Sequence, residues 1–273
     1  MNTAEQAGRE AKDATRRAAA SRPMTVLTRV GLACRGVLYA LIGVVALQIA
    51  AGDGSKEADK AGAISTLAAL PFGAVLLWIM TAGFAALALW QASEAVFGHG
   101  KALERGESVA RVVVYVLVFF TLISVLTTSK AASDDQKSQD LTAKLLALPA
   151  GPFIVGAIGL GFVVLGAYWV RRGVTKGFRE ELDRGRMSPR ARSVMDRLGL
   201  GGYVARGAIA ALAGIFVVQA AITYDADKAG GIDATLRQFA DTPAGAWLLV
   251  VVALGVLLFA GYCFGESRWR RTL

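Results

Sequence analysis

The sequence repeats one pattern three times. Each copy opens with an apolar segment that contains an arginine, passes through an acidic loop to a proline, has a glycine two residues later and ends in a second apolar segment. The aligned prolines are Pro71, Pro149 and Pro243. A further glycine recurs at the same distance beyond each proline, at Gly83, Gly161 and Gly255. Repetition at this period indicates one supersecondary unit copied along the chain, here a helical hairpin.

Six apolar runs account for most of the 55% hydrophobic residues and for the positive mean hydropathy of +0.48. They cover residues 30–51, 72–93, 110–128, 151–170, 203–223 and 244–264. Each run is close to the ~20 residues that a helix needs to cross a bilayer, and lipid cannot satisfy bare backbone polar groups outside helices. An even number of runs separates equivalent positions, so the copies face the same way. The sequence therefore predicts an all-α membrane protein with six transmembrane helices, arranged as three parallel-repeat helical hairpins around a pseudo-threefold axis.

The same pattern divides the chain into six expected segments. They are a polar N-terminal tail at 1–24, hairpin repeat 1 at 25–98, hairpin repeat 2 at 99–172, a basic linker at 173–202, hairpin repeat 3 at 203–267 and a C-terminal tail at 268–273.

The positive charges favour one side of the expected membrane. Of the 30 lysines and arginines, 23 lie in the tails and in the segments between hairpins, and seven lie in the three loops within hairpins. By the positive-inside rule, this bias predicts a multi-pass protein of the inner (plasma) membrane with both termini in the cytoplasm. The net charge of +9 then reflects topology and attraction to membrane lipids, and we expect no nucleic-acid partner.

Charged residues inside the expected spans suggest two ion pairs. The inner boundary falls near residue 32, so Arg35 lies roughly 5 Å within the apolar core. Glu94 follows Pro71 by about 20 residues, which is one bilayer crossing, and Glu266 has the same relation to Pro243. We therefore expect Arg35 to pair with Glu94, and the equivalent Arg206 to pair with Glu266.

The middle repeat departs from this scheme because Arg172 stands where the other repeats have a glutamate. Arg111 is then left without an obvious partner in its own hairpin. One interpretation is structural, with Arg111 satisfied by a neighbouring hairpin, a helix C-terminus or a lipid phosphate. The other is an anion-attracting vestibule on the inner face, lined by the candidate unpaired arginines Arg111, Arg171 and Arg172.

Residues for catalysis or metal binding are scarce. His99 is the single histidine, and the chain has no common nucleotide-binding, hydrolase or zinc motif. We therefore expect no enzyme activity, no catalytic residues, no metal and no cofactor. The two cysteines, Cys34 and Cys263, fall in the first and sixth runs, and they would lie at similar depth if those helices are neighbours.

Three segments carry a family resemblance: Val30–Tyr39, Leu67–Gly73 and Tyr203–Gly207. With these residues the chain resembles, over roughly residues 25–270, the bacterial membrane family called domain of unknown function 1206. That family is described as three repeats of a two-helix unit, and the resemblance implies no established activity or site. The middle repeat differs most, with Val112 after its arginine where the others have glycine.

Two functions are compatible with these features. The first is a noncatalytic membrane protein that acts as a structural or accessory component of an assembly and contacts a membrane-protein partner. The alternative is a narrow channel or transporter for a small solute or ion along the pseudo-threefold axis. A glycine-packed centre favours the first, and a polar passage favours the second.

Overall fold

The structure is a computed structural model, and it describes residues 22–51, 60–68, 71–97, 102–128, 134–225 and 245–271. Within these ranges the chain is all-α. Its α-helices are α2 (Arg22–Ala50), α3 (Lys60–Ala68), α4 (Gly73–Phe97), α5 (Ala102–Thr128), α6 (Asp134–Leu146), α7 (Gly151–Val174), α8 (Pro189–Thr223) and α10 (Gly245–Trp269). Two short 3-10 helices, η1 (Gly177–Glu181) and η2 (Arg184–Arg186), lie between α7 and α8.

Five of the described helices are long and apolar enough to cross a membrane. Their candidate spans are Thr25–Ala50, Gly73–Ser93, Gly151–Val174, Pro189–Thr223 and Leu249–Trp269. In the remaining long helix, α5, the apolar stretch within the described residues is Arg111–Thr127. The fold is thus that of a multi-pass helical membrane protein.

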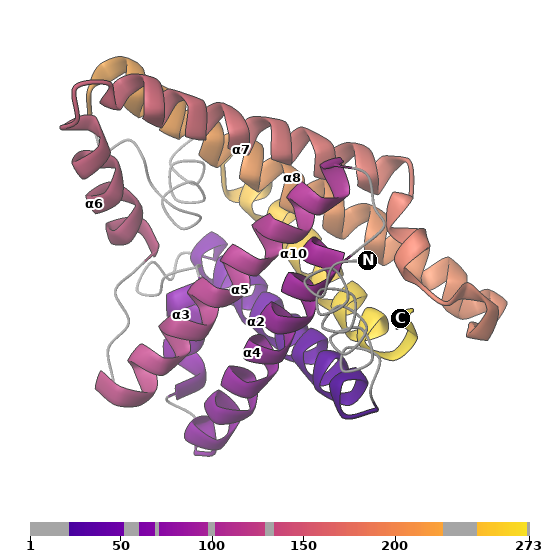
Figure 1. The fold of residues 1–273 in the computed structure, drawn as a ribbon. Coiled ribbons are helices and arrows are strands. Elements are labelled where there is room, and N and C mark those ends of the chain that lie inside the picture. Colours follow the sequence, from indigo (N-terminus) through magenta and orange to yellow (C-terminus); the bar gives the residue numbers. More distant parts are fainter. Residues whose placement is uncertain are drawn as a thin grey trace, which may run out of the picture.

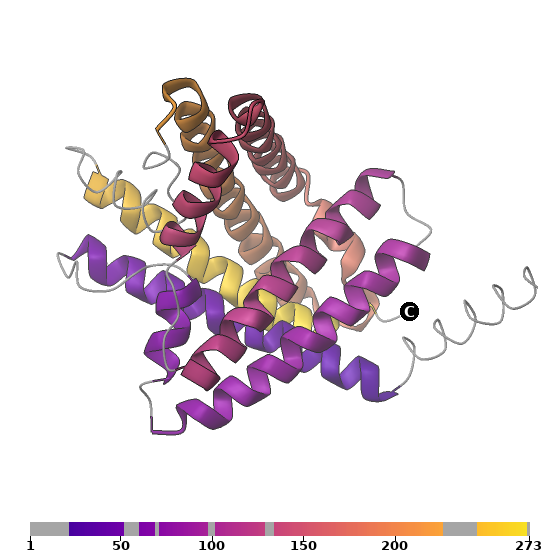
Figure 2. The ribbon, with the colours of Figure 1, turned by 60° about the vertical axis from the view of Figure 1, so that its left-hand side comes forward.

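The helices pack mainly between repeats and less within them. Helix α7 packs along α8, α10 along α2 and α4 along α5, whereas α10 on α8 and α2 on α4 make smaller contacts. In Figures 1 and 2, α7 with α8 and α4 with α5 form two pairs, and α2 and α10 lie between them. The two helices of the middle repeat, α5 and α7, make at most isolated contacts in the described residues. The helices therefore form an arc with α5 and α7 at its ends.

Glycines allow the closest helix approaches. Along α7 and α8, a Cβ atom at Gly166 would lie 2.5 Å from the carbonyl oxygen of Gly207, and one at Gly214 would lie 2.6 Å from that of Gly159. Real Cβ atoms do not approach so closely, so these backbones touch only because no side chain intervenes. Small residues at helix crossings are the usual device of membrane proteins, in which lipid removes the hydrophobic drive for helices to associate.

Helix α8 begins well before residue 203, where the sequence predicts the start of the third hairpin. Ser188 caps its first turn by accepting a hydrogen bond from the Ala191 N–H at 3.2 Å, and Pro189 occupies the first helical position, where a proline loses no hydrogen bond. The helix then runs without a break across the expected boundary at residues 202 and 203. The second half of the linker is therefore the first part of α8.

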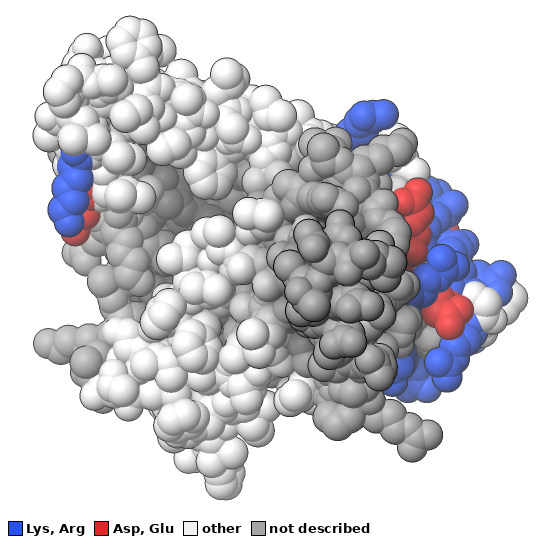
Figure 3. Space-filling model, viewed as in Figure 1, with Lys and Arg blue, Asp and Glu red and all other residues white. Residues whose placement is uncertain are grey.

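Equivalent helix ends lie at the same end of the bundle. The first halves of α2 and α5, the second halves of α4, α7 and α10 and the linker before α8 all contribute side chains to one group of contacts. Lysines and arginines gather at this end in Figure 3, where α8 begins and α10 ends. We call it the basic end.

Candidate functional site

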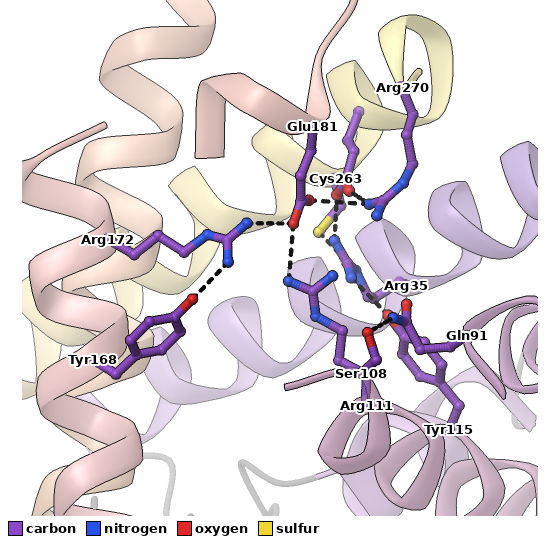
Figure 4. A network of polar contacts seen from close by, with 11 residues as sticks. Arg35, Gln91, Ser108, Arg111, Tyr115, Tyr168, Arg172, Glu181, Cys263 and Arg270 are labelled. Carbon is purple, nitrogen blue, oxygen red and sulfur yellow. Dashed lines mark hydrogen bonds and ion pairs between the residues drawn. The ribbon is translucent and has the colours of Figure 1, made fainter. Parts of the chain in front are cut away.

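A connected network of buried charges occupies the basic end. It contains four arginines and two glutamates, drawn from α2, α5, α7, η1, α10 and the residue that follows α10: Arg35, Arg111, Arg172, Glu181, Glu266 and Arg270 (Figure 4). Their side chains are between 1% and 14% exposed. We call this group the arginine network.

Arg35 is held from three directions. Its guanidinium forms an ion pair with Glu266, donates to the Tyr115 hydroxyl at 2.8 Å and donates from Nε to the Cys263 sulfur at 3.3 Å. Because Tyr115 is on α5 and the other two partners are on α10, one side chain of α2 links three helices. Cys34 and Cys263 are both buried free thiols.

Glu181 is the branch point of the network. Its Oε1 accepts from Arg111 at 3.0 Å and from Arg172 at 2.5 Å, and its Oε2 lies 3.2 Å from an Arg270 nitrogen. Arg270 also pairs with Glu266 and stacks over the ring of Trp90, 4.4 Å from its centre. A continuous path of ion pairs therefore joins α2, α10, η1, α5 and α7.

The electrostatics keep Glu181 ionised. Burial by itself would raise the pKa of this carboxyl group, but Arg111, Arg270 and Arg172 hold its pKa well below the ordinary value for glutamate. An opposite charge within hydrogen-bond distance favours the charged form, and here three such charges surround one carboxylate. Glu181 acts as a fixed anion, unsuited to giving or taking a proton near neutral pH.

The linker backbone brings Glu181 to this position. Two residues beyond the end of α7, Lys176 adopts the left-handed conformation, at φ 58°, and the chain turns back through η1. Phe178 is fully buried, stacked on Tyr203 at a centroid distance of 5.6 Å. Its ring fits only because residue 199 is glycine, since a Cβ atom there would lie 2.5 Å from the ring. The Phe178 anchor thus fixes the segment that carries Glu181.

A short antiparallel bridge then ties the linker to the end of α10. The Asp183 N–H donates to the carbonyl oxygen of Trp269 at 2.7 Å, and the Arg271 N–H donates to that of Glu181 at 3.0 Å. These bonds satisfy backbone groups beyond the last turn of α10 and align Arg270 with both carboxylates of the network.

The structure corrects the expected pairing of Arg206 with Glu266. Glu266 pairs with Arg35 of the first repeat, and Arg206 lies over the Trp169 ring, 3.8 Å from its centre. The physical reason is helix packing: α10 runs along α2 more extensively than along α8, so the nearer arginine belongs to another repeat. The expected pairing of Arg35 with Glu94 involves a side chain outside the described residues.

Two of the three arginines proposed as unpaired have a carboxylate partner. Arg111 and Arg172 both bind Glu181, so the structural interpretation, in which a neighbouring segment satisfies Arg111, agrees with the geometry. Arg171 is exposed. The prediction missed Glu181 and Arg270. A signal for Glu181 existed, because the middle repeat lacks its own glutamate and the linker carries one nine residues after Arg172.

The arginine network has the chemistry of a structural contact between helices. Over the described ranges, no three His, Cys, Asp or Glu side chains come together as a metal site. Both carboxylates of the network are bonded to arginines, and all six charges are largely removed from solvent. Removing one partner of such a buried pair leaves an uncompensated charge, which costs about 3–5 kcal/mol. The network therefore holds the helix ends together.

The fold and the network define a multi-pass helical membrane protein built from three copies of one unit. The sequence profile of the family described as Domain of Unknown Function (DUF1206) matches residues 30–98, 107–176 and 201–270. The chain belongs to this family, which confirms the resemblance. It is also similar to the protein of Bacillus subtilis (strain 168) named "Uncharacterized protein YxxB", with 30% identity over 242 residues that cover 86% of each chain. No solved structure matches the chain.

Proposed function

We propose that this protein is a noncatalytic accessory component of a membrane assembly and that it binds a membrane-protein partner through the outward face of α7. The observation that carries the proposal is the poor coverage of this helix. Only 22% of its most apolar stretch is buried in the protein, against 50% to 56% for α2, α4 and α10 and 33% for α8.

The outward face of α7 combines large apolar side chains with an unused glycine. Leu160 is 59% exposed and Val164 is 61% exposed. Between them, Gly161 has no other described atom within 4 Å of the position that a Cβ would take. The equivalent glycines of the other repeats lie in helix contacts: Gly83 packs against Gly31 and Cys34, and Gly255 packs against Ala205. Because a small residue permits close helix approach, Gly161 supports contact with a helix from another protein.

The distribution of charge supports an orientation for this assembly. Lysine and arginine are concentrated at the basic end, and the positive-inside rule associates such an end with the cytoplasm. We place the termini in the cytoplasm and the bundle in the inner (plasma) membrane. The partner would then contact α7 within the bilayer.

The arginine network supports an accessory role over the alternative of a channel or transporter. A conduit would need water or solute to pass the basic end, where ion pairs, the Phe178 anchor and the Tyr203 and Tyr262 rings fill the space between helices. The described crossings also bring backbone against backbone at glycines. Such packing suits a rigid scaffold.

The proposal is tested with Gly161→Leu, which places a bulky side chain on the proposed contact without meeting described atoms of this chain. The matched control is Ala82→Leu, an equally bulky change at an exposed position of α4. Each protein is extracted from its native membrane in a mild detergent, and the mass of the complex is measured on native gels. We expect the wild type and the control to migrate as the same larger assembly, and Gly161→Leu to lose it while keeping its own fold. Recovery of wild type only as the free chain, or equal assembly by Gly161→Leu, would contradict the proposal.

A further inference from the structure

We infer that the basic end carries a binding site for the phosphate headgroup of an anionic membrane phospholipid, formed by Arg29, Arg186 and Arg268. The site is separate from the arginine network and from the proposed partner face on α7. It stands or falls independently of the accessory role.

The site is a pocket of about 370 Å³, within the range of roughly 300–1,000 Å³ usual for small-molecule sites. Its lining comes from three separate segments: Arg29 on α2, Arg186 on η2, and Arg268 with Trp269 at the end of α10. The described lining thus has three cations and no carboxylate. This differs from the arginine network, where the four arginines share two glutamates.

Arg29 supplies a second observation that points to a ligand. Its Nε is buried and has no hydrogen-bond partner. A buried donor without an acceptor is unfavourable, and a guanidinium matches the oxygens of a phosphate group through parallel hydrogen bonds. A phosphate in the pocket would accept from Arg29 and lie between the charges of Arg186 and Arg268.

The surroundings of the pocket favour a lipid phosphate over a phosphate free in solution. Phe264 lies one helical turn before Arg268 on α10, is 43% exposed, and covers the position of Gly36 on α2. Val26 and Val30, on either side of Arg29, are 59% and 36% exposed. These apolar side chains begin directly beside the cations, so the acyl chains of a lipid held by its phosphate could lie along them.

The depth of the pocket fits the same ligand. Arg29 immediately precedes the first apolar run, Arg268 follows the last by one turn, and Trp269 stands beside it. Tryptophan is enriched at the membrane interface, and basic pockets beside membrane-spanning helices bind anionic lipid headgroups. The clustering of lysine and arginine over this end of the molecule is visible in Figure 3.

The test uses the full-length protein in detergent and counts bound lipids by native mass spectrometry. The probes are phosphatidylglycerol, which is anionic, phosphatidylcholine, which is not, and inorganic phosphate. We expect one phosphatidylglycerol to be retained in preference to phosphatidylcholine. In Arg29→Gln with Arg268→Gln, we expect retention to fall by roughly tenfold or more, because two of three cations are lost.

The matched control removes the same charge elsewhere at the basic end, with Arg190→Gln and Arg197→Gln, two exposed positions of α8. It should retain phosphatidylglycerol as the wild type does. Arg186→Gln, outside the long helices, gives a single change that does not alter a membrane-spanning segment, and it should weaken retention on its own. Equal loss in the control pair, equal binding of both lipids, or displacement of the lipid by millimolar inorganic phosphate would each overturn the inference.

Discussion

The first and third repeats differ from the middle one in how their two helices meet. In the outer repeats the shared glycine closes the hairpin, with Gly83 against Cys34 of α2 and Gly255 against Ala205 of α8. In the middle repeat the equivalent Gly161 faces open space, and α5 and α7 pack on α4 and α8. The same local pattern therefore forms the same helices and yet does not ensure that they pair with each other.

Ion pairs at the basic end connect the two helices of the middle repeat. It has Arg172 where the third repeat has Glu266, and the missing carboxylate comes from Glu181 of the linker. That one side chain connects Arg111 of α5 with Arg172 of α7. The comparison teaches that an open hairpin can be held by a segment outside it, and that its unused helix face remains available.

The largest expected effect comes from removing the link in the middle repeat. Glu181→Ala would remove the carboxylate that Arg111, Arg172 and Arg270 share and leave buried positive charge uncompensated. We expect it to lower the free energy of unfolding by about 3–5 kcal/mol. The measurement is denaturation of the purified protein in detergent micelles. Glu180→Ala, at the exposed neighbour, is the control and should change stability by no more than about 0.5 kcal/mol. Similar values for the two variants would show that Glu181 does not hold the open hairpin.

The difference between closed and open hairpins can be measured by placing a leucine at the equivalent glycine of each repeat and comparing the free energies of unfolding. Gly83→Leu and Gly255→Leu force a side chain into a filled crossing, and overpacking of this kind costs about 1–3 kcal/mol. Gly161→Leu meets open space, so its free energy of unfolding should stay within about 0.5 kcal/mol of the wild type. Equal destabilisation of all three proteins would mean that the middle hairpin is closed in the same way.

A smaller effect separates the pairing between repeats from the pairing within one. In double-mutant cycles with alanine, Arg35 and Glu266 should show a coupling energy of about 0.5–3 kcal/mol, as residues in direct contact do. Arg206 and Glu266 should show none beyond experimental scatter, because Arg206 is stacked on Trp169. Coupling between Arg206 and Glu266 that matched the first pair would restore the arrangement expected from the sequence.

Much of the candidate site can be predicted from the sequence. The sequence marks Arg35, Arg111, Arg172 and Glu266 as charges near the ends of apolar runs, and all four belong to the arginine network. The sequence predicts partners within one hairpin for Arg35 and Glu266 only, and the partner predicted for Glu266 is wrong. Glu181 and Arg270 were missed because they lie beyond the helix ends, where no periodicity marks a position in space.

The local features of this protein follow from its sequence alone. The spacing of prolines, glycines and apolar runs determines three copies of a helical hairpin, since hydropathy and helix propensity act over a few turns of chain. Only the tertiary structure decided which helices lie together: α10 lies beside α2 so that Glu266 reaches Arg35, and the linker folds back so that Glu181 reaches Arg111. These contacts join residues far apart in the chain, and they depend on how whole helix surfaces fit, which no single segment encodes.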